Sequence, residues 1–173
     1  MRFNHFSAFF LILGLSACSE APQVPELTFS TDFESEAGWL NDDRLKKSDD
    51  AHSGRWYAAS GEFLPFTPSF KMKARAISRR PLRRVEFIGW VRSGTVPSRA
   101  QLVLSAEADT TSIYYAAKPL EGFLKEAGKW TEIKTVFEIP NGSFGPDNTV
   151  NIYIWSPDRT VVGLDDVTLR FSN

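Results

Sequence analysis

Residues 85–92 read Val-Glu-Phe-Ile-Gly-Trp-Val-Arg, and this stretch is the clearest guide to the fold class. Every second residue from Val85 to Val91 is apolar or glycine, and these residues alternate with Glu86, Ile88, Trp90 and Arg92. Successive side chains of a strand point to opposite faces, so a period of two residues is typical of a half-buried β-strand. The stretch therefore predicts a strand with one face in the core.

The same alternation recurs along the chain. It is found at residues 27–33, 70–76, 102–106, 133–139, 150–155 and 167–171. Clusters of Gly, Pro, Asn, Asp and Ser separate these runs, and only residues 120–128 have a sequence that suits a helical turn or two. About eight to ten strands without a long helix predict an all-β fold, an antiparallel β-sandwich of two sheets.

The N-terminal residues are typical of an export signal. Arg2 supplies a positive charge, and residues 6–15 form an apolar run of ten, which is too short to cross a bilayer. The run ends in Leu15-Ser16-Ala17-Cys18, which resembles the lipobox of bacterial lipoproteins. That resemblance implies removal of residues 1–17 and a covalent lipid on Cys18. The alternative is an ordinary secretory signal whose first mature residue happens to be cysteine.

The lipobox also implies a location. Residues 18–27 are polar and contain two prolines, so we expect a lipidated cysteine with a flexible tether, followed by one domain over residues 28–173. Ser19 follows the cysteine and is not a retention residue for the inner membrane in the usual enterobacterial rule. We therefore expect a lipid-anchored protein of the bacterial cell envelope, in the outer membrane.

Composition excludes several classes of protein. The chain of 173 residues has 20 Lys and Arg against 21 Asp and Glu, and loss of Arg2 with the signal takes its charge from −1 to −2. A dedicated nucleic-acid binder needs a strong basic excess, so no nucleic-acid partner is expected. A single cysteine excludes an intramolecular disulfide and a metal site built from several cysteines.

A series of short motifs appears in a recognisable order. They are residues 32–34 (DFE), 38–39 (GW), 51–55 (AHSGR), 128–131 (GKWT), 150–155 (VNIYIW) and 164–167 (LDDV). The ordered set resembles the jelly-roll carbohydrate-binding modules found beside xylanases and endoglucanases, which have a galactose-binding-like β-sandwich. The resemblance covers about residues 28–172. It implies a jelly roll that binds a polysaccharide or other glycan without catalysing a reaction.

The family resemblance implies a structural calcium ion that ties the opening strand to the closing one. Glu34 matches the opening acid of the family pattern and Asp165 the closing one. Asp165 lies in phase with Val167 and Leu169, which we expect to face inward, and a buried carboxylate needs a cation, an arginine or backbone donors. Calcium takes six to eight oxygens, which carboxylates and loop carbonyls can supply. The alternative is that both acids bind backbone donors or face water.

The family resemblance also implies a ligand face on one sheet, where aromatic rings stack on sugars and polar side chains hold hydroxyl groups. The residues expected opposite the core set are Trp90, Arg92, Tyr153, Trp155 and one of Tyr114 and Tyr115, of which we take Tyr114. Gln101 is a further candidate for this face. Exposed aromatic residues usually mark contact surfaces. The alternative is that residues 120–123 or loops cover this face, so that the rings form a second layer of core. Trp39, Trp56 and Trp130 are expected to be packing residues.

Two further features bear on function. Seven basic residues lie between Lys71 and Arg84, which suits contact with anionic lipid or an acidic polysaccharide, or protection of an edge strand by charge. His52 is the only histidine after the signal, so neither a Ser-His-Asp nor a Cys-His apparatus is supported, and we expect no enzyme.

The sequence thus predicts a membrane-anchored, non-catalytic lipoprotein that resembles a carbohydrate-binding module. The alternative is a structural envelope lipoprotein, or one that binds an envelope protein, without a glycan ligand. A small hydrolase is a third hypothesis and needs two carboxylates that converge in a deep pocket.

Overall fold

A computed structural model of the protein describes residues 27–35 and 45–173. The predicted signal peptide, Cys18, the tether up to residue 26 and the Gly38-Trp39 motif lie outside these described residues. Ten strands and one helix form the described part. They are β1 (Leu27–Thr31), β2 (Leu45–Lys47), β3 (Trp56–Ala59), β4 (Phe70–Lys73), α1 (Ala74–Ile77), β5 (Arg84–Ser93), β6 (Gln101–Ala108), β7 (Thr111–Pro119), β8 (Thr131–Glu138), β9 (Thr149–Trp155) and β10 (Val162–Ser172).

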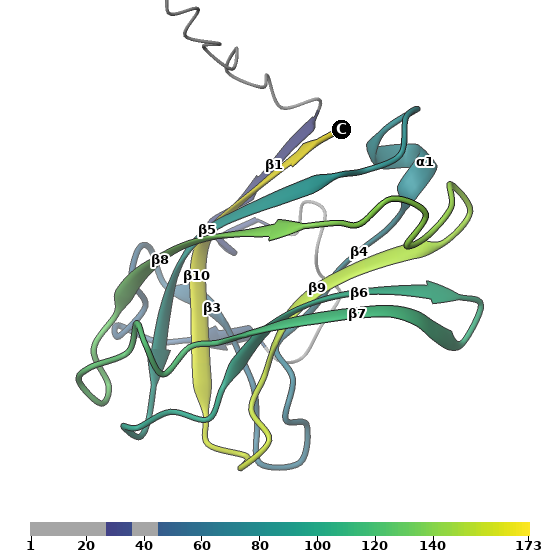
Figure 1. The fold of residues 1–173 in the computed structure, drawn as a ribbon. Coiled ribbons are helices and arrows are strands. Elements are labelled where there is room, and N and C mark those ends of the chain that lie inside the picture. Colours follow the sequence, from purple (N-terminus) through teal and green to yellow (C-terminus); the bar gives the residue numbers. More distant parts are fainter. Residues whose placement is uncertain (1–26, 36–44) are drawn as a thin grey trace, which may run out of the picture.

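The strands form two antiparallel sheets that lie against each other (Figure 1). Sheet A has the order β2-β3-β10-β5-β8, and β1 also pairs with β10. Sheet B has the order β4-β9-β6-β7. The prediction of an all-β antiparallel sandwich is confirmed, and β1 begins at Leu27, the last residue that we assigned to the tether.

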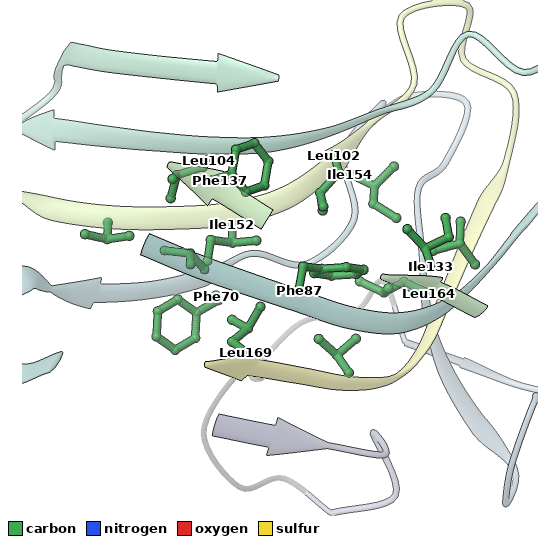
Figure 2. Close-up of a cluster of buried hydrophobic side chains, with 14 of the residues drawn as sticks. Phe70, Phe87, Leu102, Leu104, Ile133, Phe137, Ile152, Ile154, Leu164 and Leu169 are labelled. Atoms are coloured by element: carbon green, nitrogen blue, oxygen red, sulfur yellow. The ribbon is translucent and has the colours of Figure 1, made fainter. Parts of the chain in front are cut away.

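The core lies between the sheets and follows the alternation of the strands. Along β5 the residues Val85, Phe87 and Val91 are almost fully buried, while Glu86, Ile88 and Trp90 are half-buried. Figure 2 shows Phe87 beside Leu164 and Ile133 of sheet A, with Leu102 and Ile154 of sheet B across the layer. A two-residue period with one face in this layer fixes which side chains of each strand point outward.

The two ends of the sandwich differ in the chain segments that they carry. Leu27 pairs with Phe171, and Phe171 pairs with Val85, so the described chain begins where β10 ends and β5 begins. We call this the entry end, and α1 also lies there (Figure 1). The loops that follow β3, β5 and β9 lie at the opposite end, the loop end, where Val161 accepts a backbone hydrogen bond from Gly94 at 3.1 Å.

Local predictions were less accurate than the fold class. The alternation over residues 70–76 predicted a strand throughout, but β4 stops at Lys73 and α1 follows, because Ala74 and Arg75 donate their amides to the loop carbonyls of Asn148 and Pro146. Residues 120–128 contain two turns, one closed by the Leu124 amide on the Leu120 carbonyl at 3.1 Å and one by the Lys129 amide on the Glu126 carbonyl at 3.5 Å. Among the described residues, no helix has the length and apolar character needed to cross a membrane.

Candidate ligand-binding face

The outer face of sheet B carries three aromatic side chains close together. Ile152 and Ile154 of β9 point into the core, so the alternating residues Tyr153 and Trp155 point outward. Phe66, in the loop before β4, forms a β-bridge with Trp155, and its ring meets that of Tyr153 at 5.7 Å and 78°. We call Phe66, Tyr153 and Trp155 the aromatic group.

Tyr115, not Tyr114, adds a further ring to this face. Tyr115 pairs with the outward Ser105 of β6 and is 51% exposed. Tyr114 pairs with the buried Ala106, and its ring packs on Phe144 at 5.6 Å, so the choice of Tyr114 as the outward residue was wrong. The two tyrosines are adjacent in the sequence and chemically alike, so only the strand register distinguishes them.

Asn151 lies in the same face with an unsatisfied amide. It stands between Lys71 of β4 and Ser105 of β6, and only 5% of its surface is exposed. Its Nδ2 has no hydrogen-bond partner among the described residues. A buried amide donor without a partner is uncommon in native proteins, and this one is covered by its neighbours, so it marks a gap in the hydrogen bonding of the face.

Two polar features lie near Asn151, a neutral phenol at Tyr153 and a pair of opposite charges at Lys71 and Glu107. Burial raises the pKa of the Tyr153 phenol, and the neighbouring Tyr115 and Glu107 raise it further, while a hydrogen bond with Ser105 acts in the opposite direction. The phenol is therefore protonated at neutral pH and keeps a proton to donate. Glu107 lies 3.7 Å from the ammonium group of Lys71, so these two opposite charges are close to each other.

Trp90 lies on the outer face of the other sheet. It belongs to β5 of sheet A and pairs with Asp165 and Glu132, whereas Trp155 belongs to sheet B. His52 stacks on the Trp90 ring at 3.8 Å and 15°. The expectation that Trp90 and Trp155 share one face was wrong, because alternation separates inward from outward positions but does not assign a strand to a sheet.

Arg92 is held beside Trp90 by two aromatic rings. Its guanidinium lies 4.7 Å from the Tyr57 ring and 4.9 Å from the Trp130 ring, and Nη2 donates to the Tyr57 hydroxyl at 2.9 Å. The Trp130 indole donates to the Asp50 carbonyl at 2.7 Å. These contacts fit the alternative of a second packed layer, here formed on sheet A by the turn over residues 50–56.

One part of this layer stays open to solvent. The edges of Trp90 and Trp130, with Phe123, border an open hollow of about 360 Å³. Phe123 is 37% exposed. His52 stacks on one side of the Trp90 ring, so that side is not free for a ligand.

The two acids that the resemblance implied as calcium ligands both bind the backbone of one turn. Glu34 Oε1 accepts the amides of Arg55 and Trp56 at 2.6 and 2.5 Å. Gly54, with φ +57°, leaves room for this carboxylate, since an added Cβ would lie 2.3 Å from Glu34 Cδ. The glycine of the AHSGR motif therefore permits a close contact between the opening acid and the turn.

Asp165 is buried by the same turn. Its Oδ2 accepts the amides of His52 and Ser53 at 2.9 and 3.2 Å, and its Oδ1 accepts the Asp166 amide at 2.8 Å. Burial raises the pKa of the Asp165 carboxyl to about 6, although these backbone hydrogen bonds act to lower it. The expected phase was wrong, because a β-bulge at Asp166, with φ +46°, places Leu164 and Val167 inward and Asp165 outward.

The donor set of these acids does not fit a calcium site closely. The described residues contain no group of three or more His, Cys, Asp or Glu that could hold a metal ion. Both carboxylates accept backbone N–H groups, which is the other means of stabilising a buried carboxylate. Calcium binding at Glu34 and Asp165 stays a prediction that needs a direct measurement.

Ser53, His52 and Asp166 lie together but do not form a catalytic triad. The Ser53 hydroxyl donates to Asp166 Oδ1 at 2.8 Å, and His52 Nδ1 lies 2.5 Å from Asp166 Oδ2. In a triad the serine would donate to the histidine, whereas here both side chains bind the carboxylate. The arrangement holds the turn on the bulge of β10.

Sequence reasoning missed Phe66 and Asn151 as members of the sheet B face, and it left Tyr115 as the alternative to Tyr114. Asn151 shares the two-residue period of Tyr153 and Trp155, so the alternation of β9 was a signal that could have found it. Phe66 lies between Pro65 and Pro68 in a loop, where no periodicity marks the direction of a side chain.

Comparison with known proteins gives similarity of structure only. No family model and no curated protein sequence matches the chain. The CBM22-1 xylan-binding domain of Xyn10C from Paenibacillus barcinonensis is similar, with 17% identity, a TM-score of 0.54, and coverage of 87% of this chain and 96% of that domain. The CBM22-2 xylan-binding domain of the same protein has 16% identity and a TM-score of 0.51, over 84% of this chain and 99% of that domain. The chain therefore has a β-sandwich fold like that of carbohydrate-binding modules.

Proposed function

We propose that the protein is a membrane-anchored, non-catalytic lipoprotein of the bacterial envelope that binds a polysaccharide on the outer face of sheet B. The observation that carries this proposal is the group of outward rings on this face, where Phe66 is 38% and Tyr115 51% exposed and Tyr153 and Trp155 point outward with them. Apolar rings with a few directed polar groups are typical of sites that bind small or extended ligands. The structurally similar domains are described as xylan-binding, so xylan is the first probe.

The binding test uses purified full chain and affinity electrophoresis in gels that contain soluble xylan or other soluble polysaccharides. We expect Trp155→Ala to weaken binding about tenfold, which is the effect of losing one central aromatic contact. Phe123→Ala is the matched control, because Phe123 is an exposed ring on the sheet A side. Equal loss in both variants, or no loss in Trp155→Ala, would contradict the assignment of the face.

The anchor is tested separately by mass spectrometry of the protein isolated from membranes. We expect cleavage before Cys18 and a covalent diacylglycerol with a further acyl chain at this residue. Several acyl chains give durable attachment, since each buried methylene contributes about 0.8 kcal/mol. An unmodified Cys18 would contradict the anchor and leave the glycan face to be judged on its own.

A second candidate function is binding of a protein partner, and the loop end favours it. Phe63 is 87% exposed, and Leu64 and Val161 are each 50% exposed. Exposed apolar side chains at one place often mark protein contacts. If no polysaccharide binds, and Phe63→Ala but not Trp155→Ala reduces capture of an envelope protein, the function lies at the loop end.

A further inference from the structure

The entry end carries arginines whose charge no acid balances. The sequence segment from Lys71 to Arg84 crosses β4, α1 and the start of β5, so it does not follow a single strand. Arg75 pairs with Asp147, and Arg84 lies 3.5 Å from Glu138. Within residues 27–35 and 45–173, Arg79, Arg80 and Arg83 form no ion pair. We call these three residues the arginine cluster.

Protection of an edge strand accounts for the lysines but not for the arginine cluster. β4 is an edge strand of sheet B and carries Lys71 and Lys73, and charge on an edge strand discourages aggregation. Arg79 and Arg80 follow α1 in a loop, and Arg83 precedes β5, so none of the three lies on a strand. Their concentration at one end needs another reason.

A hollow beside the arginine cluster combines charge with apolar surface. It has a volume of about 270 Å³ and lies between the loop after α1 and residues 141–146. Arg79 and Arg80 line it, and the buried Leu82 and half-buried Phe144 supply apolar walls. Arginine binds phosphate oxygens with two parallel hydrogen bonds, and apolar walls suit the glycerol part of a headgroup.

The point where the described chain begins brings this end close to the expected lipid. Leu27 pairs with Phe171, which pairs with Val85, so Leu27 lies only two strands away from the start of β5. Eight residues separate Cys18 from Leu27, and a segment of this length reaches at most about 30 Å. A lipid on Cys18 would therefore keep the arginine cluster within reach of the membrane surface.

From this geometry we propose that the arginine cluster docks the domain on anionic phospholipid headgroups, with one headgroup in the hollow. The proposal rests on the proposed anchor for its orientation, and it is independent of glycan binding. Juxtamembrane basic residues are attracted by anionic leaflets over about one Debye length. The docked domain stands on its entry end, and the loop end points away from the membrane.

The test measures the orientation of lipid-modified full chain in vesicles. A lipid on the Cys18 thiol leaves an introduced cysteine as the only free thiol, so Pro140→Cys reports on the entry end and Glu62→Cys on the loop end. Each thiol carries a fluorophore that nitroxide-labelled headgroups quench. In phosphatidylethanolamine with about one quarter phosphatidylglycerol, we expect the label at position 140 to be quenched about threefold more than the label at position 62.

Charge removal should abolish this difference. The triple variant Arg79→Gln, Arg80→Gln, Arg83→Gln, neutral phosphatidylcholine vesicles, or about 0.5 M NaCl should each bring the two labels to equal quenching. The matched control is Arg99→Gln, Lys125→Gln, Lys129→Gln, which removes three exposed charges elsewhere and should keep the threefold difference. The salt measurement uses unaltered arginines, so a folding defect in the variant does not decide the result.

Several outcomes would overturn the proposal. One is that the arginine variant keeps the threefold difference in quenching between the two labels. Another is that neutral vesicles give the same threefold difference as anionic ones. A third is that a soluble acidic polysaccharide abolishes this difference while salt does not. A failure of the anchor is recognised separately by the mass of Cys18. In that case the unmodified chain is sedimented with the same vesicles, and absence of salt-sensitive binding to the anionic ones would refute the docking surface itself.

Discussion

The outer faces of sheet A and sheet B each carry a tryptophan at an outward strand position, Trp90 on β5 and Trp155 on β9. His52 stacks on Trp90 at 3.8 Å, and the turn that contains it is held by its amides on Asp165. Trp155 has Phe66 beside it, and Asn151, whose buried amide has no partner, lies four residues away along the same face of β9. A tryptophan at an outward strand position is therefore a packing residue where a turn covers it, and a candidate ligand contact where no turn does.

The largest effect on stability is expected on the covered face. Trp90→Ala removes the ring on which His52 stacks, and it should lower the free energy of unfolding by about 3 to 4 kcal/mol, as for other large aromatic truncations. Urea denaturation measures this, and Phe123→Ala is the control, with an expected change below about 1 kcal/mol. A small effect of Trp90→Ala would mean that the two faces do not differ in the way described.

A pH dependence should identify the buried carboxylate of the covered face. Burial raises the pKa of Asp165 from 3.8 to about 6. A raised pKa favours the protonated form in the folded state, so the stabilisation is complete below pH 3.8 and is lost as the pH rises through about 6. The full shift corresponds to about 3 kcal/mol of stability, of which we expect about 2 kcal/mol to be lost between pH 4 and pH 7 in EDTA.

The comparison variant for this pH profile is Asp165→Asn, which does not titrate at this position. Its own cost is independent of pH, so subtracting its profile from that of the wild type isolates the Asp165 contribution. Calcium at Asp165 would hold the carboxylate ionised, and then added calcium should remove the decline and raise the melting temperature. An identical profile with calcium and with EDTA would count against the calcium site.

A glycine substitution tests the turn that covers sheet A. Gly54→Ala adds a Cβ that meets the Glu34 carboxylate at a backbone conformation unfavourable for alanine, so we expect a loss of about 2 kcal/mol. Gly61→Ala is the matched control, because nothing lies within 4 Å of its added Cβ. Equal melting temperatures for the two variants would show that the turn tolerates displacement of Glu34.

The smallest effect is expected at the unpartnered amide of sheet B. Asn151→Ala should change the free energy of unfolding by less than about 1 kcal/mol, since no hydrogen bond of Nδ2 is lost. If a bound polysaccharide draws this buried amide outward to one of its hydroxyl groups, the variant should bind about fivefold more weakly, the value of one hydrogen bond to a ligand. Unchanged affinity together with lower stability would make Asn151 a structural residue.

Alternation of apolar residues is enough to predict the sandwich and the inward faces of β5 and β9, because each strand has one side in the core. It cannot assign strands to sheets, which is why Trp90 and Trp155 were placed together. It also fails where the backbone leaves the regular period, as at Asp166, where a positive φ accompanies the β-bulge. Contacts such as Phe66 with Tyr153 depend on loops that carry no periodic signal.

The central claim is that sheet B, not sheet A, binds glycan, and the most direct measurement is NMR of the tryptophan indole N–H signals during titration with xylan oligosaccharides. The Trp155 signal, assigned with Trp155→Phe, should shift or broaden as ligand is added, while the signals of Trp90 and Trp130 stay in place. Shifts of the Trp90 and Trp130 signals with an unchanged Trp155 signal would contradict the claim and move the ligand to the hollow on sheet A.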